Sequence, residues 1–288
     1  MKQQYDLYGV GNAIMDIQVQ CNDDFLTEHG IDKGVMTLVD AARQQEILDA
    51  LQGHKLHFCS GGSAANTTVG VAEMGGRCAY ACLTGDDDCG AMYLQEMRDL
   101  GVTIDTAATS GVTGRCVVLI TPDAQRTMLT HLGVSANLQS HHLDGRELAR
   151  ASFVYVEGYL FAGEETRTAA LEAITLANAS GCRVALTLSD PFLIDICRDT
   201  FTELLKSGQI DLLFCNEIEA QAVTGCKDPQ ACATWLHQYG ATVALTLGAQ
   251  GSLILHQGES IEIAGVAATA VDTTGAGDMY AAGLLIGI

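Results

Sequence analysis

Phe153-Val154-Tyr155-Val156 opens the part of the chain that decides the fold. This short apolar run of β-branched and aromatic residues is typical of a buried strand. Beyond it, apolar runs alternate with longer amphipathic ones. Strands are expected over 184–188, 210–215, 242–247 and 252–256, and helices over 164–179, 192–206, 217–223, 229–239 and from 275 onward. Because continuous apolar strands separated by amphipathic helices must be covered on both sides, this part predicts an α/β fold with a parallel sheet between helices.

The first 132 residues follow a different pattern, with short strands broken by Gly, Asn and Asp. Apolar and polar residues alternate over 14–20, and 115–121 and 125–131 are expected to pair as a hairpin across Thr121-Pro122-Asp123-Ala124. Alternating strands suit a small sheet with one solvated face. We therefore expect a single domain, 1–288, with a small β-sheet lid whose strands lie roughly in 12–40 and 103–131. Further expected elements are a strand over 34–39 and helices over 41–51, 62–74 and 90–100.

Composition and charge exclude several classes of protein. The 288 residues suffice for one large α/β domain, and the formal net charge of −20 argues against a nucleic-acid partner. No apolar run reaches the roughly 18 residues of a membrane span, and the N-terminus lacks a signal-peptide layout. Eleven cysteines without a Cys-x-x-Cys pair indicate buried free thiols in a reducing compartment. We expect a cytoplasmic protein.

Two familiar phosphate-binding motifs are missing. The sequence has no G-x-x-x-x-G-K-[ST], which excludes a P-loop. Gly9-Val10-Gly11-Asn12-Ala13-Ile14 begins like a dinucleotide fingerprint but has Ile where the third glycine belongs, which disfavours a Rossmann dehydrogenase.

The turn Gly275-Ala276-Gly277-Asp278 offers another way to hold an anion. Small residues at a helix start let backbone N–H groups converge on an anion, with the helix dipole adding to them. Asp278, in the first turn, could accept a proton from a hydroxyl that attacks a phosphoryl group held there. The alternative is an ordinary helix start with an acidic residue favoured by the dipole.

A second glycine pair, Gly61-Gly62, precedes Ser63 and Asn66 at the start of another helix. Glycines allow a ligand to approach the backbone, and the Asn66 amide can both donate and accept, as a polyol requires. The alternative is a turn and a helix with Asn66 on its polar face.

Together these motifs resemble the paired signatures of the ribokinase-like (PfkB) carbohydrate and nucleoside kinases. Three more segments agree in order along the chain: Gly11-Asn12-Ala13-Ile14-Met15-Asp16, Asn216-Glu217-Ile218-Glu219, and Thr246-Leu247-Gly248-Ala249-Gln250-Gly251. The resemblance implies a ribokinase-like three-layer α/β/α domain with a mostly parallel sheet, and ATP-dependent phosphoryl transfer to a hydroxymethyl group. Glu157-Gly158-Tyr159-Leu160 and Leu188-Ser189-Asp190-Pro191-Phe192 look most like bacterial adenosine-kinase-type members.

The resemblance also implies roles for single residues. Asp278 is the general base, and Gly275, Ala276 and Gly277 form the anion hole. ATP lies on Asn216, Thr246, Gly248 and Gly251, and Glu219 organises Mg²⁺ through water. Some members bind a monovalent cation, K⁺ for example, near the position of Asp272. The ribose of the acceptor is held by Asn12, Asp16, Gly61, Gly62, Ser63 and Asn66.

The acceptor and the assembly stay open at this level. A purine nucleoside phosphorylated at its 5′-hydroxyl is the leading hypothesis, and a furanose sugar such as fructose or ribose, or a non-catalytic nucleoside-binding protein, are the alternatives. A monomer or a homodimer is expected. Arg115 and Arg126, in the predicted hairpin, are candidates for positive charge over the phosphates, with solvated arginines as the alternative. The family pattern usually continues beyond the equivalent of Ile288, so we expect C-terminal elements of the adenine-side wall to be missing.

Overall fold

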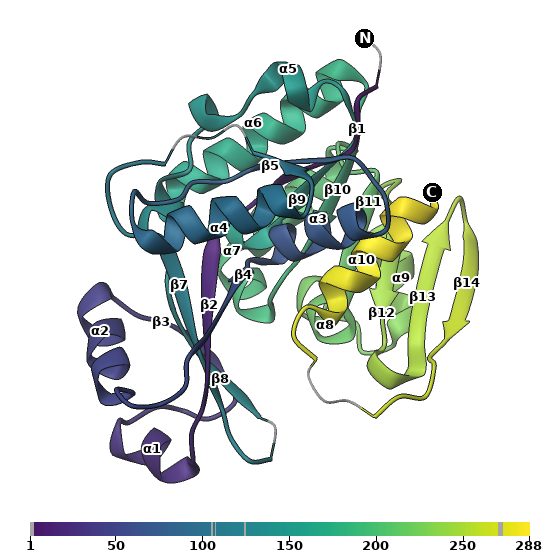
Figure 1. The fold of residues 1–288 in the computed structure, drawn as a ribbon. Coiled ribbons are helices and arrows are strands. Elements are labelled where there is room, and N and C mark those ends of the chain that lie inside the picture. The colour runs from purple at the N-terminus through teal and green to yellow at the C-terminus, as the bar shows by residue number, and fades with distance from the viewer. Residues whose placement is uncertain (1–2, 105, 107, 124, 270–272) are drawn as a thin grey trace.

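The computed structural model describes residues 3–104, 106, 108–123, 125–269 and 273–288. Within them, a large sheet runs through the molecule and a smaller sheet projects from it (Figure 1). Neighbouring strands of the large sheet are parallel from β6 to β12, and β13 and β14 add an antiparallel edge. Its order is β14 (Glu259–Ala264), β13 (Gly251–His256), β12 (Thr242–Thr246), β11 (Leu212–Asn216), β10 (Arg183–Thr187), β9 (Ala151–Glu157), β1 (Tyr5–Val10), β5 (Cys78–Ala81) and β6 (Val102–Thr103).

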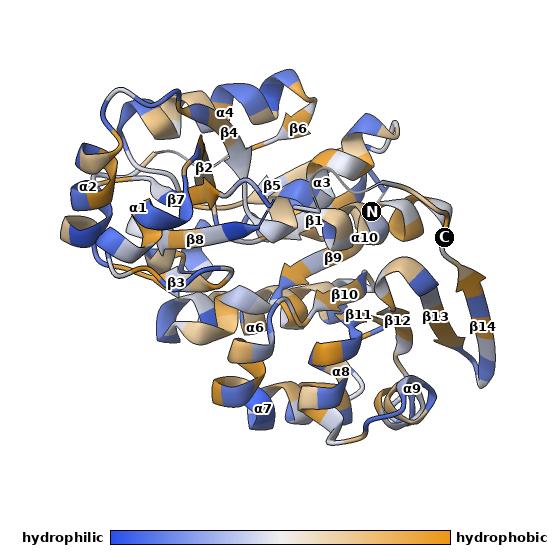
Figure 2. Ribbon diagram, turned by 90° about the horizontal axis from the view of Figure 1, so that it is seen from below, coloured by the Kyte–Doolittle hydropathy of each residue, from blue (hydrophilic) through white to orange (hydrophobic). Residues whose placement is uncertain are grey.

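Helices cover both faces of the large sheet, as the alternation after residue 152 predicts. Successive strand residues face opposite sides: Val154 packs into the core under one set of helices and Phe153 into the core under the other. In Figure 2, β9 and β13 are mainly orange, whereas α6 and α7 carry both colours, as half-exposed helices do. The first set is α5 (Gly145–Leu148), α6 (Glu164–Ser180), α7 (Pro191–Lys206), α8 (Glu217–Thr224) and α9 (Pro229–His237), and the second is α3 (Ser63–Glu73), α4 (Asp88–Asp99) and α10 (Ala276–Gly287).

The small sheet has two unequal faces. Its odd-numbered residues on β7, such as Val117, pack against α1 (Asp23–Glu28) and α2 (Ala41–Ala50). The even-numbered ones, such as Cys116, face the large sheet and its covering helices, which together are called the large domain. The face away from the helices is therefore not simply solvated, as the sequence suggested, but borders a cavity described below. The order of the strands is β3 (Met36–Leu38), β8 (Arg126–His131), β7 (Gly114–Ile120), β2 (Ile14–Gln20) and β4 (His57–Gly61).

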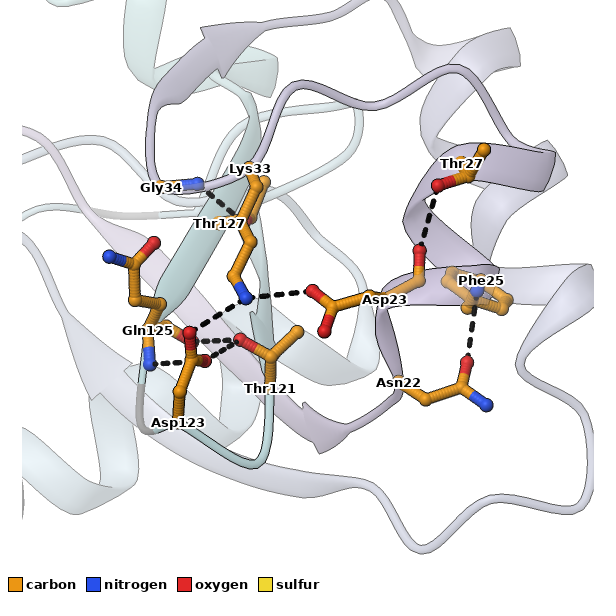
Figure 3. Close-up of polar contacts among 10 residues, drawn as sticks. All are labelled: Asn22, Asp23, Phe25, Thr27, Lys33, Gly34, Thr121, Asp123, Gln125 and Thr127. Atoms are coloured by element: carbon orange, nitrogen blue, oxygen red, sulfur yellow. Dashed lines mark hydrogen bonds and ion pairs between the residues drawn. The ribbon is translucent and has the colours of Figure 1, made fainter.

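Polar contacts fasten the outer end of the small sheet (Figure 3). The Lys33 ammonium group lies 2.7 Å from an Asp23 carboxylate oxygen on α1 and 2.8 Å from one of Asp123 in the β7–β8 connection. The Thr127 hydroxyl accepts a hydrogen bond from the Gly34 N–H. These contacts join the segment before β3 to the β7–β8 hairpin. The antiparallel register of β7 and β8 confirms that predicted hairpin.

The predicted elements differ from the structure in the first 132 residues. β1, β5 and β6 belong to the large sheet, not to a separate region of short strands, and β4 joins the small sheet although it lies outside the expected lid ranges. The predicted strands also omit β1, β5, β6 and β14. Eleven free cysteines, seven of them buried, agree with the expected thiols. No helix within the described ranges combines the length and hydropathy that crossing a bilayer requires.

Candidate active site

The Asp278 carboxylate, in the first turn of α10, is held by two side chains of α3. Its Oδ1 atom accepts a hydrogen bond from the Ser63 hydroxyl at 2.8 Å, and its Oδ2 atom accepts one from the Asn66 amide at 2.9 Å. The Thr67 hydroxyl donates to the Asp278 carbonyl oxygen at 3.3 Å. The two motifs that lie more than 200 residues apart in the sequence are therefore brought together.

Close packing of α3 on α10 makes this contact possible. A Cβ atom added to Gly70 of α3 would lie 2.1 Å from the Met279 methyl carbon and 2.8 Å from the Ala282 Cβ atom. Only glycine lets the two helices approach so closely here. The packing aligns their N-terminal turns, which carry Ser63, Asn66 and Asp278.

Two cavities meet at Asp278. The first, of about 240 Å³, lies at the carboxyl ends of β10, β11 and β12 and is called the strand-end cavity. The second, of about 220 Å³, lies between the small sheet and the large domain and is called the small-sheet cavity. Four residues line both: Ser63, Tyr159, Gly275 and Asp278. A group bound in one cavity would therefore meet a group bound in the other at this carboxylate.

Polar and apolar side chains both line the small-sheet cavity. Five of the polar ones were predicted as site residues: Asn12, Asp16, Ser63, Asn66 and Asp278. The apolar wall comes from the small sheet and from α7. It includes Ile14, Met36, Leu38, Met128, Phe192 and Leu193. None of these wall residues is a predicted site residue, although Ile14 and Phe192 stand in segments that resemble the kinase family.

The Gly61-Gly62 pair fits against Asn12 and Asp16. A Cβ atom at Gly61 would lie within 2.9 Å of both Asp16 carboxylate oxygens. Gly62 has a φ of 105°, and a Cβ atom there would lie 2.4 Å from the Asn12 carbonyl oxygen. Glycine is therefore required at both positions by the neighbouring protein atoms.

The buried carboxylate of Glu157 holds Asn12 in place. Glu157, at the end of β9, has no exposed surface. One oxygen accepts hydrogen bonds from the Asn12 N–H at 2.7 Å and from its side-chain amide at 2.5 Å, and the other accepts one from the Ala64 N–H at 2.9 Å. In the sequence, Glu157 and Tyr159 stand out only through their resemblance to adenosine-kinase-type members. A charged residue directly after a buried apolar strand of a parallel sheet was the signal that could have identified Glu157 as a site residue.

Burial raises the pKa of the carboxyl groups around the cavities. It raises the pKa of Asp16 to about 7, with the charge of Arg126 opposing and that of Asp278 adding to the effect. Burial also raises the pKa of Glu157 and of Glu219 to about 7, against the hydrogen bonds that each accepts. The pKa of Asp278 is raised by burial, although its hydrogen bonds oppose this. Acidic groups with raised pKa values at the junction of two cavities are typical of catalytic sites.

Asn216 and Glu219 form a reciprocal cap at the start of α8. The Asn216 N–H and side-chain amide donate to the two Glu219 carboxylate oxygens at 3.0 and 2.7 Å, and the Glu219 N–H donates to the Asn216 side-chain oxygen at 2.8 Å. Both residues line the strand-end cavity, as does Thr246. Gly248 and Gly251 shape the turn between β12 and β13 through positive φ angles of 58° and 104°, and neither lines the cavity.

A metal ion bound in the strand-end cavity would take most of its coordination from phosphate and water oxygens. Among the described residues, no group of three or more His, Cys, Asp or Glu side chains is placed to hold a metal ion. Each Glu219 oxygen accepts one hydrogen bond from Asn216 and keeps a further lone pair for a water molecule. This donor set fits a hydrated, phosphate-bound Mg²⁺ better than a protein-only site.

The predicted anion hole lies at the start of α10, where Gly275 has a φ of 69°. The Ala276 N–H donates to the Thr273 carbonyl oxygen at 3.2 Å, so it closes the turn. The N–H groups of the first helical turn have no carbonyl partner four residues earlier within the helix. All three predicted residues, Gly275, Ala276 and Gly277, line the strand-end cavity. Asp272, the predicted neighbour of a monovalent cation, lies outside the described residues.

The two candidate arginines lie on opposite faces of the small sheet. Arg126 shares its face with Met128, which lines the small-sheet cavity, and its guanidinium group donates to the Thr273 hydroxyl at 3.0 Å. Arg115 alternates with Cys116 and points to the helix-covered side. Burial acts to raise the pKa of Asp87, but hydrogen bonds from Thr113 and Gly90 and the charge of Arg115 hold it below its usual value.

A carboxylate between two cavities, next to a helix start with free N–H groups, is the arrangement expected of an enzyme that transfers a group between two bound molecules. The chain belongs to the PfkB family of carbohydrate kinases, whose model matches residues 34–288. The protein is therefore a kinase that phosphorylates a sugar or a nucleoside.

Known proteins of both substrate classes are similar to it. A solved adenosine kinase from Sinorhizobium meliloti is 37% identical, with a TM-score of 0.91 over 98% of this chain and 87% of that one. A probable sugar kinase from Rhizobium etli CFN 42 is 34% identical, with a TM-score of 0.92 over 99% and 87%. The ribokinase of Mus musculus is 29% identical over 82% of this chain and 73% of its own.

Proposed function

We propose that this kinase transfers the γ-phosphoryl group of ATP to the 5′-hydroxyl of a purine nucleoside such as adenosine. The observation that carries the proposal is the mixed lining of the small-sheet cavity, in which Ser63 and Asn66 gather at Asp278 and apolar side chains of the small sheet and α7 form much of the wall. The polar side chains suit the hydroxyls of a ribose, and the apolar ones suit the flat faces of a base. A free sugar would leave the apolar wall without a partner.

The apolar wall predicts a measurable preference. If a base buries roughly 100 Å² of apolar surface there, it gains about 2.5 kcal/mol, or roughly a factor of 70 in affinity. The similarity to the adenosine kinase of Sinorhizobium meliloti supports the same choice. A sugar kinase that acts on fructose or ribose remains the alternative, supported by the similarity to a probable sugar kinase.

The proposed chemistry uses Asp278 as general base. Asp16 and Asn66 would hold the ribose hydroxyls, which directs the 5′-hydroxyl toward the Asp278 carboxylate. As the oxygen attacks the γ-phosphorus, the bond from that phosphorus to the bridging oxygen would break and ADP would leave. Asp278 would take the proton of the hydroxyl, and the N–H groups that follow Ala276 would stabilise the charge on the phosphoryl oxygens. A raised pKa brings the carboxyl group closer to the pH at which a base works best.

The strand-end cavity would take ATP. Thr246 and Asn216 line it, and Glu219 would accept hydrogen bonds from water molecules on Mg²⁺. The metal ion supplies charge neutralisation on the phosphates when it is bound. The Arg126 guanidinium group, next to Thr273, would add positive charge from the small sheet.

The test is a panel of nucleosides and sugars with ATP and Mg²⁺, monitored by ADP release. Adenosine should have a kcat/KM well above those of ribose and fructose, and the product should carry phosphate on its 5′-oxygen. 5′-Deoxyadenosine is the matched control, because it keeps the base and ribose but lacks the reacting hydroxyl. Ribose or fructose turning over as efficiently as adenosine would refute the nucleoside proposal in favour of the sugar. Tight adenosine binding without ADP release would instead indicate a binding protein.

A further inference from the structure

The chain passes between the large and the small sheet four times, and the four passages meet at one buried point. They are the β1–β2 connection at Asn12, the β4–α3 connection at Gly62, the entry into β7 at Gly114, and the exit from β8 into the short helix Gly133–Asn137, which carries Ser135. We call this meeting point the joint.

The backbones of the joint are in direct contact. A Cβ atom at Gly114 would lie 2.8 Å from both the Ala13 and the Leu132 carbonyl oxygens, and one at Gly62 would lie 2.4 Å from that of Asn12. The passages therefore pack closely against each other, and the Ile14 side chain also reaches Gly114, with its Cδ1 atom 2.6 Å from the place of a Cβ atom there. A change in how one passage sits must be accommodated by the others.

Hydrogen bonds that centre on Glu157 connect these passages to the large sheet. The carboxylate accepts bonds from the Asn12 N–H and side chain in the first passage and from the Ala64 N–H just after the second. The Ser135 hydroxyl, beyond the fourth passage, donates to the Asn12 side-chain oxygen at 3.0 Å and accepts from the Ala13 N–H at 3.0 Å. Glu157 itself belongs to β9, in the middle of the large sheet (Figure 1).

We propose that Glu157 is a positioning residue, whose carboxylate fastens the joint and so sets where the small sheet lies relative to Asp278. The proposal rests on the proposed function only in taking the small-sheet cavity as the acceptor site. The wall of that cavity is built from both sides of the joint: Asp16 and Met128 come from the small sheet, and Asp278 from the large domain. The cavity has the right width only when the joint is fastened.

The chemistry requires a carboxylate at this position. Three donors point at the two Glu157 oxygens, and an ionised carboxylate offers acceptors only. A glutamine of the same shape would turn its NH₂ group toward either the Asn12 or the Ala64 N–H, so two donors would face each other in a buried place. Glu157→Gln therefore breaks the network while keeping the volume.

The experiment compares Glu157→Gln with Ser135→Ala and a control, Gln44→Met. Gln44 is buried and donates to the Arg115 and Leu129 carbonyl oxygens within the small sheet, so its loss weakens the fold away from the joint. Two readouts are taken: amide hydrogen exchange by mass spectrometry over 11–14 and 62–66, and the KM values for adenosine and ATP. The exchange readout does not depend on which acceptor is correct.

In Glu157→Gln, exchange should accelerate over 11–14 and 62–66 while the central strands stay protected. The KM for adenosine should rise about tenfold to a hundredfold, the range expected when buried donors lose their partner, and the KM for ATP should stay within about threefold. Ser135→Ala should change the exchange rate and the KM for adenosine in the same directions as Glu157→Gln, but by smaller amounts. If Glu157→Gln does not fold, the result for Ser135→Ala tests the proposal in its place. Gln44→Met should lower the melting temperature without either change.

The proposal is overturned if Glu157→Gln behaves like Gln44→Met, with a lower melting temperature but unchanged adenosine KM and no localised exchange. If the wild-type protein phosphorylates none of the nucleosides, the proposed function fails. The exchange pattern then still decides whether Glu157 fastens the joint.

Discussion

Replacing Asp278 by asparagine tests the assignment of the base most directly, because the structure predicts that nothing else changes. The asparagine oxygen can take the hydrogen bond from the Asn66 amide, and its NH₂ group can donate to the Ser63 hydroxyl, which is able to reverse its role. Both contacts of the side chain are therefore kept. The substitution removes only the proton acceptor and the buried negative charge.

The substitution should lower turnover without lowering the stability of the protein. A positioned general base contributes about 10²- to 10⁴-fold, so kcat should fall by about 10³-fold, or about 4 kcal/mol of transition-state stabilisation. Burial raises the pKa of Asp278, which means that the ionised form is less favourable in the folded protein than in the unfolded chain. At pH 8 the variant should therefore be at least as stable as the wild type.

The assay pairs turnover with thermal unfolding at pH 8, and Asp123→Asn is the control. Asp123 has its pKa lowered to about 2, chiefly by hydrogen bonds from Lys33 and Thr121, so its loss should reduce stability slightly and leave turnover intact. Adenosine binding to Asp278→Asn should persist in calorimetry. If Asp278→Asn keeps more than a tenth of wild-type turnover, or if it is clearly less stable, the assignment of Asp278 as base is wrong.

Three further predictions follow from the geometry. Arg126→Ala should lower kcat/KM by about tenfold or more through the loss of a cation near the phosphates, whereas Arg115→Ala on the opposite face should stay within about threefold; equal effects in steady-state kinetics would contradict the assignment by face. Gly62→Ala should destabilise the protein by about 2–4 kcal/mol in urea unfolding, because its φ is 105° and a carbonyl oxygen occupies the place of the new Cβ atom; a loss below 1 kcal/mol would count against the close contact. Burial raises the pKa values of Asp16 and Glu219 to about 7 in the folded protein, so protonation favours the folded state. The melting temperature should therefore rise between pH 8 and pH 6 while kcat/KM falls. No change in either quantity over this range would show that these carboxyl groups titrate normally.

Much of the fold could be predicted because its signals are local. The strand of residues 153–156 and those that follow are buried on both faces, so they appear as continuous apolar runs whatever their neighbours are. β1 and β5 are of the same kind, but they lie among the short segments of the small sheet. Their membership of the large sheet depends on pairing with β9 and with each other, which no local pattern reveals.

The residues of the site likewise include some that a local sequence pattern reveals and others that it does not. Gly62 and Gly275 stand where the backbone needs a positive φ, and Asp278 stands next to such a turn, so a short motif can reveal them. The apolar wall is assembled from single residues of four segments, such as Ile14, Met36 and Phe192. None of these differs in its local sequence from an ordinary core or surface residue.

The sequence by itself determined the α/β class, the turn at Gly275 and the carboxylate that follows it, because these rest on periodicity and on backbone constraints that act over a few residues. Only the tertiary structure decided that Arg126 and not Arg115 shares the face of the small sheet that borders the cavity, that Glu157 anchors Asn12, and that Asp278 lies where two cavities meet. These facts depend on register and on contacts between residues about a hundred positions or more apart. Such contacts form only when the sheets and helices have packed.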